Sequence, residues 1–292
     1  MIVPVYNARA TIGACLRSIL AQDVDDVWEL LVVDSSDDGT ADLLRREFPA
    51  VRVLFRDRRT AAGAARQHAL GVATGWLVAF TDADCVVAPD WLRRLLARHR
   101  AAEHPAVGGA VANGTPASIL GSAEHLFSFN EFMPGMPERL VAGMPTCNLC
   151  YRREVLAAIA FESGPEGAFL QPEDLLLNWR VTGGARRLLF DPAIRVTHQN
   201  RTRLVACVRH QYLIGRSACW ARTRAELPGR TFAARWWLSP LVAPLRVGRI
   251  AMRLVRHDRG ALLRLLALLP AVLLVAAAWG AGFTREAFRS RR

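Results

Sequence analysis

The sequence predicts an α/β fold, a mostly parallel sheet flanked by helices, followed by C-terminal helices that associate with a membrane. Three observations support this prediction: short β-rich runs alternate with helical patterns through the first hundred residues, polar residues stand where those runs end, and cationic and long apolar segments are confined to the end of the chain. Such alternation is typical of βαβ units, whose strands lie parallel. With 292 residues, 52% of them hydrophobic, the chain can fill a large core.

The predicted elements follow in order along the chain. Strands are expected at 2–6, 29–34, 51–55 and 76–81, and helices at 11–22, 41–48, 62–73 and 91–101. A looser region contains a helix at 118–132, strand candidates at 187–190 and 194–198, and a basic helix at 203–224. In open α/β sheets, ligands bind beyond the carboxyl ends of the strands. We therefore expect Asn7, Asp34, Asp82 and Asp84 to converge on one crevice.

The tetrad Thr81-Asp82-Ala83-Asp84 directly follows the apolar run 76–80. Side chains two residues apart in an extended strand point to the same side, so the two carboxylates can share one divalent cation or divide a cation and a sugar between them. The chain has neither G-x-G-x-x-G after the first strand nor G-x-x-x-x-G-K-[ST]. A nucleotide bound here would therefore need Mn²⁺ or Mg²⁺ to bridge its diphosphate.

Several motifs in order resemble the family 2 glycosyltransferases, whose nucleotide-sugar-binding domain has the type A glycosyltransferase fold. Residues 3–7 resemble the first strand and nucleoside-binding loop, 32–40 the second loop, 63–67 a compressed G-x-x-x-A-R-N stretch, and 81–84 the D-x-D motif. The resemblance covers about residues 1–200. It departs from the family pattern where paired aspartates usually follow Val33, and where Gln67 replaces the common Asn.

The resemblance implies a role for each matching residue. Asp84 would bind Mn²⁺ or Mg²⁺, and His198 is either a further metal ligand or a structural histidine. The residues that would contact the nucleotide-diphosphate sugar are Pro4, Tyr6, Asn7, Asp34, Arg66 and Asp82.

The second half of the resemblance concerns the acceptor. Residues 146–156 resemble the segment before the acceptor site, and Glu173-Asp174-Leu175 resembles the family's E-D helix. An inverting transfer needs a base on the acceptor hydroxyl, and the resemblance assigns that role to Asp174, with Glu173 in support. Asn148 and Arg180 are expected on the acceptor side. Ordinary helix capping is the alternative explanation for the two adjacent carboxylates.

Charge divides the chain unevenly. Residues 1–200 carry 20 Arg and 23 acidic residues, whereas residues 201–264 carry 14 Arg and 2 acidic residues, and there is no lysine. A basic stretch leading into an apolar segment indicates attraction to anionic lipid. The roughly 19 uncharged residues at 265–283 would span about 28 Å as a helix and predict a membrane crossing. Residues 232–254, interrupted by arginines, are predicted to be interfacial.

Alternatives remain for this tail. A C-terminal helical pair packed on a soluble partner would also explain it, whereas nucleic acid is not expected because no recognition motif accompanies the arginines. No signal peptide precedes the first strand, so we expect the catalytic domain on the cytoplasmic side of the cytoplasmic membrane. The predicted domains are 1–205, catalytic, with nucleotide-binding (1–104) and acceptor (105–205) halves; 206–260, interfacial helices; and 261–292, a transmembrane helix and short basic tail.

Six cysteines are scattered, and only Cys147 and Cys150 form a C-x-x-C pair. Without a second pair, neither zinc nor a disulfide framework has its usual spacing, so each cysteine is predicted to be a small core residue.

The function expected from these features is an inverting, metal-dependent sugar transfer from a nucleotide diphosphate to an acceptor hydroxyl, on a lipid-linked or envelope glycan. A haloacid-dehalogenase-type phosphatase using Asp82 and Asp84 is the rival enzyme, but that class commonly uses a lysine and places its signature after the first strand. A non-enzymatic, membrane-anchored nucleotide-sugar-binding module is the other alternative. It requires Asp84 and Asp174 to be dispensable.

Overall fold

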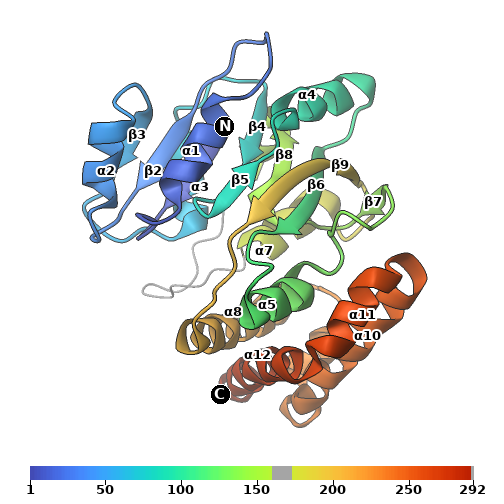
Figure 1. Cartoon of the computed structure of the whole chain (residues 1–292). Helices are drawn as coiled ribbons and strands as arrows, with labels where there is room; N and C mark the ends of the chain where they lie inside the picture. The colour runs from blue at the N-terminus through green and yellow to red at the C-terminus, as the bar shows by residue number, and fades with distance from the viewer. Residues whose placement is uncertain (160–172, 291–292) are drawn as a thin grey trace. The chain divides into compact units, whose positions relative to one another are not determined.

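The computed structural model describes residues 1–159 and 173–290, and Glu173 by its backbone alone. The chain forms two compact units (Figure 1). The N-terminal unit comprises Met1–Ala112 and Glu138–His198, and the C-terminal unit comprises Asn113–Pro137 and Gln199–Arg292. Residues 113–137 thus group with the C-terminal helices. The predicted domain boundaries at 205 and 260 separate regions by their expected roles, not by how the chain packs. They therefore stay a prediction.

The N-terminal unit is built on a mixed sheet with strand order β3-β2-β1-β4-β8-β6-β9-β5, and β7 pairs with β9 (Figure 1). The first four strands are parallel: β1 (Ile2–Val5), β2 (Leu31–Asp34), β3 (Arg52–Phe55) and β4 (Leu77–Phe80). Each is joined to the next by a helical crossover, which parallel pairing requires. The predicted α/β class is confirmed, and these four strands form a parallel half of the sheet.

Four pairings of the later strands are antiparallel. β8 (Leu149–Arg152) pairs with β4 and with β6 (Ala106–Asn113), while β9 (Leu188–His198) pairs with β5 (Cys85–Val87) and β7 (Arg139–Val141). The two strand candidates at 187–190 and 194–198 form the single strand β9. Because β9 runs antiparallel to β5, the end of β9 lies beside the start of β5, next to the D-x-D tetrad.

Helices of the N-terminal unit cover the sheet with apolar faces. They are α1 (Ile12–Leu20), α2 (Thr40–Glu47), α3 (Ala62–Leu70), α4 (Trp91–Ala101), α6 (Arg153–Ala157), α7 (Glu173–Thr182) and the 3₁₀ turn η1 (Thr146–Asn148). Helix α1 is representative, since it buries Ile12, Leu16 and Ile19 at helical spacing. Helix α3 packs on β1 and β2, α1 on β5, and α4 on β9. This packing holds the loops after the parallel strands in place.

The C-terminal unit is helical. It contains α5 (Ile119–Phe129), α8 (Leu204–Arg224), α9 (Arg230–Ala234), the 3₁₀ segment η2 (Trp236–Leu241), α10 (Val242–His257), α11 (Arg259–Ala267) and α12 (Leu269–Arg289). Helix α12 packs along α8 and against α5. At this contact a Cβ on Gly215 would lie 1.9 Å from the Trp279 carbonyl oxygen, and one on Gly282 would lie 1.8 Å from the Tyr212 carbonyl oxygen. Only glycine allows this close approach.

The predicted membrane span at 265–283 is divided between α11 and α12 at Leu268. Within the described part of the chain, α12 alone is long and apolar enough to cross a membrane, by length and composition, and 44% of its most apolar window is buried inside the protein. All six cysteines are buried and free, which confirms their assignment as core residues.

Candidate active site

The end of β2 presents a buried carboxylate that is only half satisfied. Asp34 is buried, and its Oδ1 accepts hydrogen bonds from the backbone N–H and the hydroxyl of Ser36, at 3.1 and 2.6 Å. Its Oδ2 is also buried and has no hydrogen-bond partner among the described residues. Leaving a buried acceptor without a donor is costly. A ligand N–H at this point would remove that cost.

The loop after β1 is tied to the loop after β2. Asn7 has a φ of 52°, a left-handed conformation that asparagine tolerates better than most residues. Its backbone N–H donates to the Ser36 hydroxyl at 2.8 Å, and its side-chain amide exchanges hydrogen bonds with Asp37 at 2.8 and 3.0 Å. Ser36 therefore connects Asn7 to Asp34. The structure thus brings together the first two predicted nucleotide-binding loops.

An arginine that the sequence reasoning missed lies over Tyr6. The guanidinium carbon of Arg59 stands 4.1 Å from the centre of the Tyr6 ring, within cation–π range. Its position before α3 gave no signal, because 56–59 is a run with three arginines and no periodicity. Pro4 lies in β1 and is half-buried, and its contact with a nucleotide stays a prediction.

Arg66 and Asp82 form an ion pair at the end of β4. Arg66 on α3 is only 1% exposed, and its Nη2 donates to Asp82 Oδ1 at 2.5 Å. The Asp82 side chain keeps 33% of its surface exposed, so it faces both the arginine and the open side of the sheet edge. Burial raises the pKa of Asp82 against the lowering effect of Arg66, and Asp84 adds to the rise.

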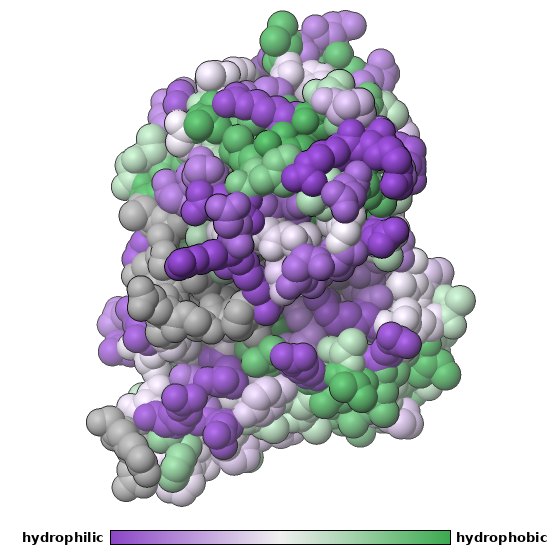
Figure 2. Space-filling view, turned by 90° about the vertical axis from the view of Figure 1, so that its left-hand side faces the viewer, coloured by the Kyte–Doolittle hydropathy of each residue, from purple (hydrophilic) through white to green (hydrophobic). Residues whose placement is uncertain are grey.

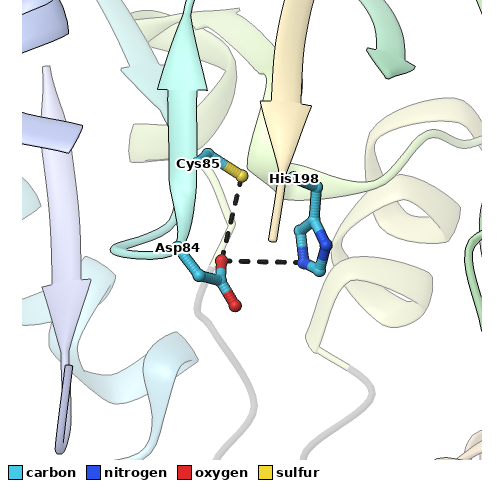
Figure 3. Close-up of side chains that lie close together, drawn as sticks. All are labelled: Asp84, Cys85 and His198. Atoms are coloured by element: carbon cyan, nitrogen blue, oxygen red, sulfur yellow. Dashed lines mark hydrogen bonds and ion pairs between the residues drawn. The ribbon is translucent and has the colours of Figure 1, made fainter. Parts of the chain in front are cut away.

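Asp84, Cys85 and His198 lie together where β5 begins and β9 ends (Figure 3). His198 Nε2 is 3.6 Å from Asp84 Oδ1, the Cys85 thiol is 3.9 Å from the same oxygen, and all three atoms lie within 4.8 Å of one another. A carboxylate oxygen and an imidazole nitrogen suit Mn²⁺, and the carboxylate also suits Mg²⁺. A hydrogen bond to Cys147 and burial raise the pKa of Cys85 well above its ordinary value. Sulfur is a soft ligand, which Mn²⁺ and Mg²⁺ prefer less than carboxylate oxygen.

The two aspartates of the D-x-D motif therefore have different partners. Asp82 pairs with Arg66, whereas Asp84 points to His198. The sequence left open whether the two carboxylates share one cation or whether one binds a cation and the other a sugar. This geometry fits the second arrangement. It also fits the ligand alternative for His198.

Asp174 lies in the first turn of α7, within the electrostatic influence of Arg66 and Asp82. Its Oδ1 accepts a hydrogen bond from the Leu175 N–H at 2.7 Å. Burial raises the pKa of Asp174; Asp82 adds to the rise, while the Leu175 N–H and Arg66 oppose it. A carboxylate about ninety residues away in the chain is thereby brought near the D-x-D motif.

Two buried residues hold the start of α7, and the sequence analysis did not identify them. The Asn178 amide donates to the carbonyl oxygens of Asp174 and Met144, at 2.7 and 2.8 Å, and accepts from the Tyr151 hydroxyl at 2.9 Å. Asn178 stands one helical turn after Asp174, and this i, i+4 spacing was the available signal. Arg180 is exposed near the end of α7, and the Glu173 side chain lies outside the described residues.

The predicted acceptor contact of Asn148 is wrong. Asn148 is fully buried, its amide donates to the Ala110 and Ile194 carbonyls at 2.9 and 3.1 Å, and its oxygen accepts from Trp91 Nε1 at 2.7 Å. With both amide hydrogens and the oxygen engaged, it joins β6, β9 and α4 rather than facing a substrate. The motif located the segment correctly but did not show which way this side chain points.

Comparison with known proteins identifies the class of protein that carries this site. The family described as Glycosyl transferase family 2 matches residues 1–159, more than half of the chain, and the chain belongs to that family. It is a glycosyltransferase, as expected from its motifs. This identification sets aside the phosphatase and the non-enzymatic binding module.

Individual relatives agree with this. The chain is 28% identical over 248 residues to Glycosyltransferase AglE of Haloferax volcanii, covering 82% of this chain and 79% of that protein. It is 38% identical over 86 residues to the UDP-Glc:alpha-D-GlcNAc-diphosphoundecaprenol beta-1,3-glucosyltransferase WfgD of Escherichia coli, covering 29% of this chain and 34% of that protein.

A solved structure shows the same fold. The mannosyltransferase PcManGT from Pyrobaculum calidifontis, in complex with GDP-Man and Mn²⁺, superposes with a TM-score of 0.64 at 20% identity, covering 100% of this chain and 87% of that one. The type A glycosyltransferase fold is thereby confirmed.

Proposed function

We propose that this glycosyltransferase moves a sugar from a nucleotide-diphosphate sugar to an acceptor hydroxyl with inversion at the sugar carbon, using Mn²⁺ or Mg²⁺. The observation that carries the proposal is the grouping of Asp174, the Arg66–Asp82 pair and the Asp84–His198 pair around the D-x-D motif. The GDP-Man and Mn²⁺ bound in the structural neighbour support the donor and metal classes.

The nucleoside would bind at the ends of β1 and β2. The unsatisfied Asp34 Oδ2 is an acceptor for an N–H of the base, and the Tyr6 ring with Arg59 above it offers a flat, cationic surface. Asn7, held by Ser36 and Asp37, keeps the two loops in register. These residues order the donor without contacting the bond that breaks.

The diphosphate and sugar would lie at the end of β4. Asp84 and His198 would hold the cation, which when bound neutralises the diphosphate and stabilises it as a leaving group. Asp82 is fixed by Arg66 on one oxygen, which leaves its other oxygen to accept hydrogen bonds from sugar or ribose hydroxyls.

Asp174 is the proposed base. Its raised pKa makes the deprotonated carboxylate a stronger base than an ordinary aspartate, as removal of a hydroxyl proton needs. It would accept the acceptor's proton while the diphosphate leaves on the opposite face of the sugar. Asn178 holds the backbone of this turn, and Glu173 and Arg180 would position the acceptor.

The acceptor is proposed to be lipid-linked or part of an envelope glycan, at the cytoplasmic face of the membrane. The diphosphoundecaprenol acceptor in the name of WfgD and the basic, apolar C-terminal helices support this. The acceptor's identity does not affect how the donor is bound.

The test measures nucleotide release from a panel of UDP- and GDP-sugars, with and without Mn²⁺, for the wild type, Asp84→Ala and Asp174→Asn. We expect one donor to be turned over only with the metal, and both variants to lose at least about a hundredfold. Asp174→Asn should still bind the donor in a thermal-shift assay. If both variants kept wild-type turnover, the assigned site would be wrong.

A further inference from the structure

The net positive charge of the chain comes from the C-terminal unit. Residues 113–137 and 199–292 hold 18 Arg and 5 acidic residues, whereas the N-terminal unit holds 20 Arg and 21 acidic residues. The C-terminal unit also contains most of the large apolar side chains that are exposed. On the face shown in Figure 2, hydrophobic residues gather in patches bordered by hydrophilic ones. Cations beside exposed apolar surface are typical of proteins that bind anionic membranes.

Helix α10 buries Ile250 and Leu254, as a surface helix does, but two of its arginines also point inward. Its Arg246 points inward, donates to the Phe127 carbonyl at 3.1 Å and lies 4.3 Å from the Phe127 ring centre. Arg253 likewise points inward, to Asn130 and Glu131. The opposite face leaves Leu245 and Met252 51% and 56% exposed. Large apolar side chains thus remain exposed on α10 beside its buried ones.

Exposed apolar side chains continue on the neighbouring elements. Trp237 and Leu241 of η2, and Leu263 and Leu266 of α11, are all at least half exposed. We call the exposed side chains of Trp237, Leu241, Leu245, Met252, Leu263 and Leu266 the apolar face. Exposed Arg249 and Arg256 alternate with Leu245 and Met252 along one stripe of α10, where their long side chains can reach lipid phosphates.

A groove opens between η2, the start of α10 and the second half of α12. It has a volume of about 660 Å³, and small α12 residues such as Ala277 and Gly280 line it. Trp236 and Phe288, packed edge to face at 5.7 Å, line it as well, together with Arg285. An apolar groove with a cation beside it fits one hydrocarbon chain of an anionic lipid.

Helix α12 is held within the protein along one face. Its buried side chains include Val275 and Trp279, and Gly282 lies against the backbone of α8. Glu286 near its end pairs with Arg216 of α8 at 2.9 Å. Helix α8 itself carries four arginines and no acidic residue. A membrane-crossing α12 would either leave α8 or take those charges into the bilayer, which is strongly unfavourable.

We propose that η2, α10, α11 and α12 form a docking surface for an anionic phospholipid bilayer, that α12 lies in the plane of the membrane rather than crossing it, and that the groove takes one lipid chain. The proposal replaces the predicted span at 265–283 with in-plane attachment. It deepens the membrane location given under the proposed function and does not depend on the transfer reaction.

The test uses the full-length protein, without donor, and vesicles of phosphatidylcholine alone or mixed with phosphatidylglycerol. We expect co-sedimentation with the mixed vesicles, weakened by salt, because the attraction is partly electrostatic. Leu245→Glu with Met252→Glu should weaken binding by about tenfold or more. Val27→Glu, an exposed apolar position in the N-terminal unit, is the matched control and should bind as the wild type does.

A second pair of measurements separates docking from spanning. Protein bound to cell membranes should be released by alkaline carbonate. The substitution Ala281→Trp, which fills the groove, should weaken vesicle binding while leaving the melting temperature near that of the wild type. Resistance to carbonate would show a span and overturn in-plane docking. If the double Glu variant bound vesicles as well as the wild type does, the apolar face would belong to a protein partner instead. A dimer in solution that these substitutions dissociate would give the same assignment. Donor turnover without vesicles tests the proposed function separately.

Discussion

Arg66 of α3 and Asp82 after β4 are joined by a 2.5 Å contact in which the arginine is almost completely buried and the aspartate is not. The pair gives Asp82 a fixed direction at the sheet edge. It also places a permanent positive charge behind the carboxylates of a site that must bind a diphosphate. The packing of α3 on β1 and β2 sets its position.

Replacing this arginine tests its role in donor binding. Arg66→Met removes the charge while filling the space, and leaves Asp82 without its charged partner. Loss of a charged hydrogen-bond partner costs about 1–3 kcal/mol, so kcat/KM for the donor should fall by roughly ten- to a hundredfold. Steady-state kinetics with a saturating acceptor measures the fall. Arg45→Met, on an exposed arginine of α2, is the control and should leave kcat/KM unchanged.

The pH profile tests the base. As the proposed base, Asp174 would act only when deprotonated, and its pKa is raised by burial and by Asp82. Activity should therefore decline on the acid side at a higher pH than an aspartate with the ordinary pKa of about 3.9 would give. Asp174→Asn should lower kcat by about a hundredfold or more and abolish this acid limb. A variant that kept the same limb at reduced kcat would show that another group titrates.

The metal ligands can be distinguished from their neighbour. Asp84→Asn and His198→Gln should each weaken Mn²⁺ binding by about tenfold or more, because each removes a ligand from the same ion. Calorimetric titration of Mn²⁺ into the protein with the nucleoside diphosphate measures this. Cys85→Ser is the matched control: sulfur is a softer ligand than Mn²⁺ prefers, so the affinity for Mn²⁺ should stay close to wild type. A large loss in Cys85→Ser would instead make the sulfur a ligand.

His99 predicts how stability depends on pH. Burial lowers the pKa of His99 from 6.5 to about 4, and its Nε2 lies 3.1 Å from the Cys150 carbonyl, so the folded protein keeps the ring neutral. Between these values the unfolded chain binds the proton and the folded one does not. Stability is therefore full above about pH 6.5 and falls as the pH drops towards 4, by about 3 kcal/mol in all.

Denaturant unfolding between pH 7 and 4 checks this contribution. His99→Gln can keep a donor to the Cys150 carbonyl and cannot titrate, so its stability should fall less steeply over this range than that of the wild type. If the two slopes were equal, protonation of His99 would not contribute to acid sensitivity.

The sequence predicted those parts of the site that depend on strand ends. Asp34, Asp82 and Asp84 follow apolar runs, and Arg66 stands at the matching place in a family motif, so their grouping followed from topology. The direction of a side chain in an irregular segment did not follow, and Asn148 shows the consequence. Its amide is turned into the core, where Trp91 and the Ala110 carbonyl are its partners.

The C-terminal helices show a second limit of sequence reasoning. Hydropathy identifies an apolar stretch but not what covers it: 265–283 predicted a span, and α12, which is long and apolar enough to cross a membrane, also packs along α8. The inward arginines of α10 were equally hidden, because their acceptors at Phe127, Asn130 and Glu131 are more than a hundred residues away in the chain.

The close approach of α8 and α12 depends on two hydrogens, because Gly215 and Gly282 each face a backbone carbonyl where a methyl group cannot fit. Gly282→Ala would therefore force these helices apart at a point outside the catalytic unit. Such a protein should hydrolyse its donor at the wild-type rate in solution and yet be recovered less well with anionic vesicles. Substitution of these glycines would thus separate membrane attachment of this enzyme from its catalytic activity.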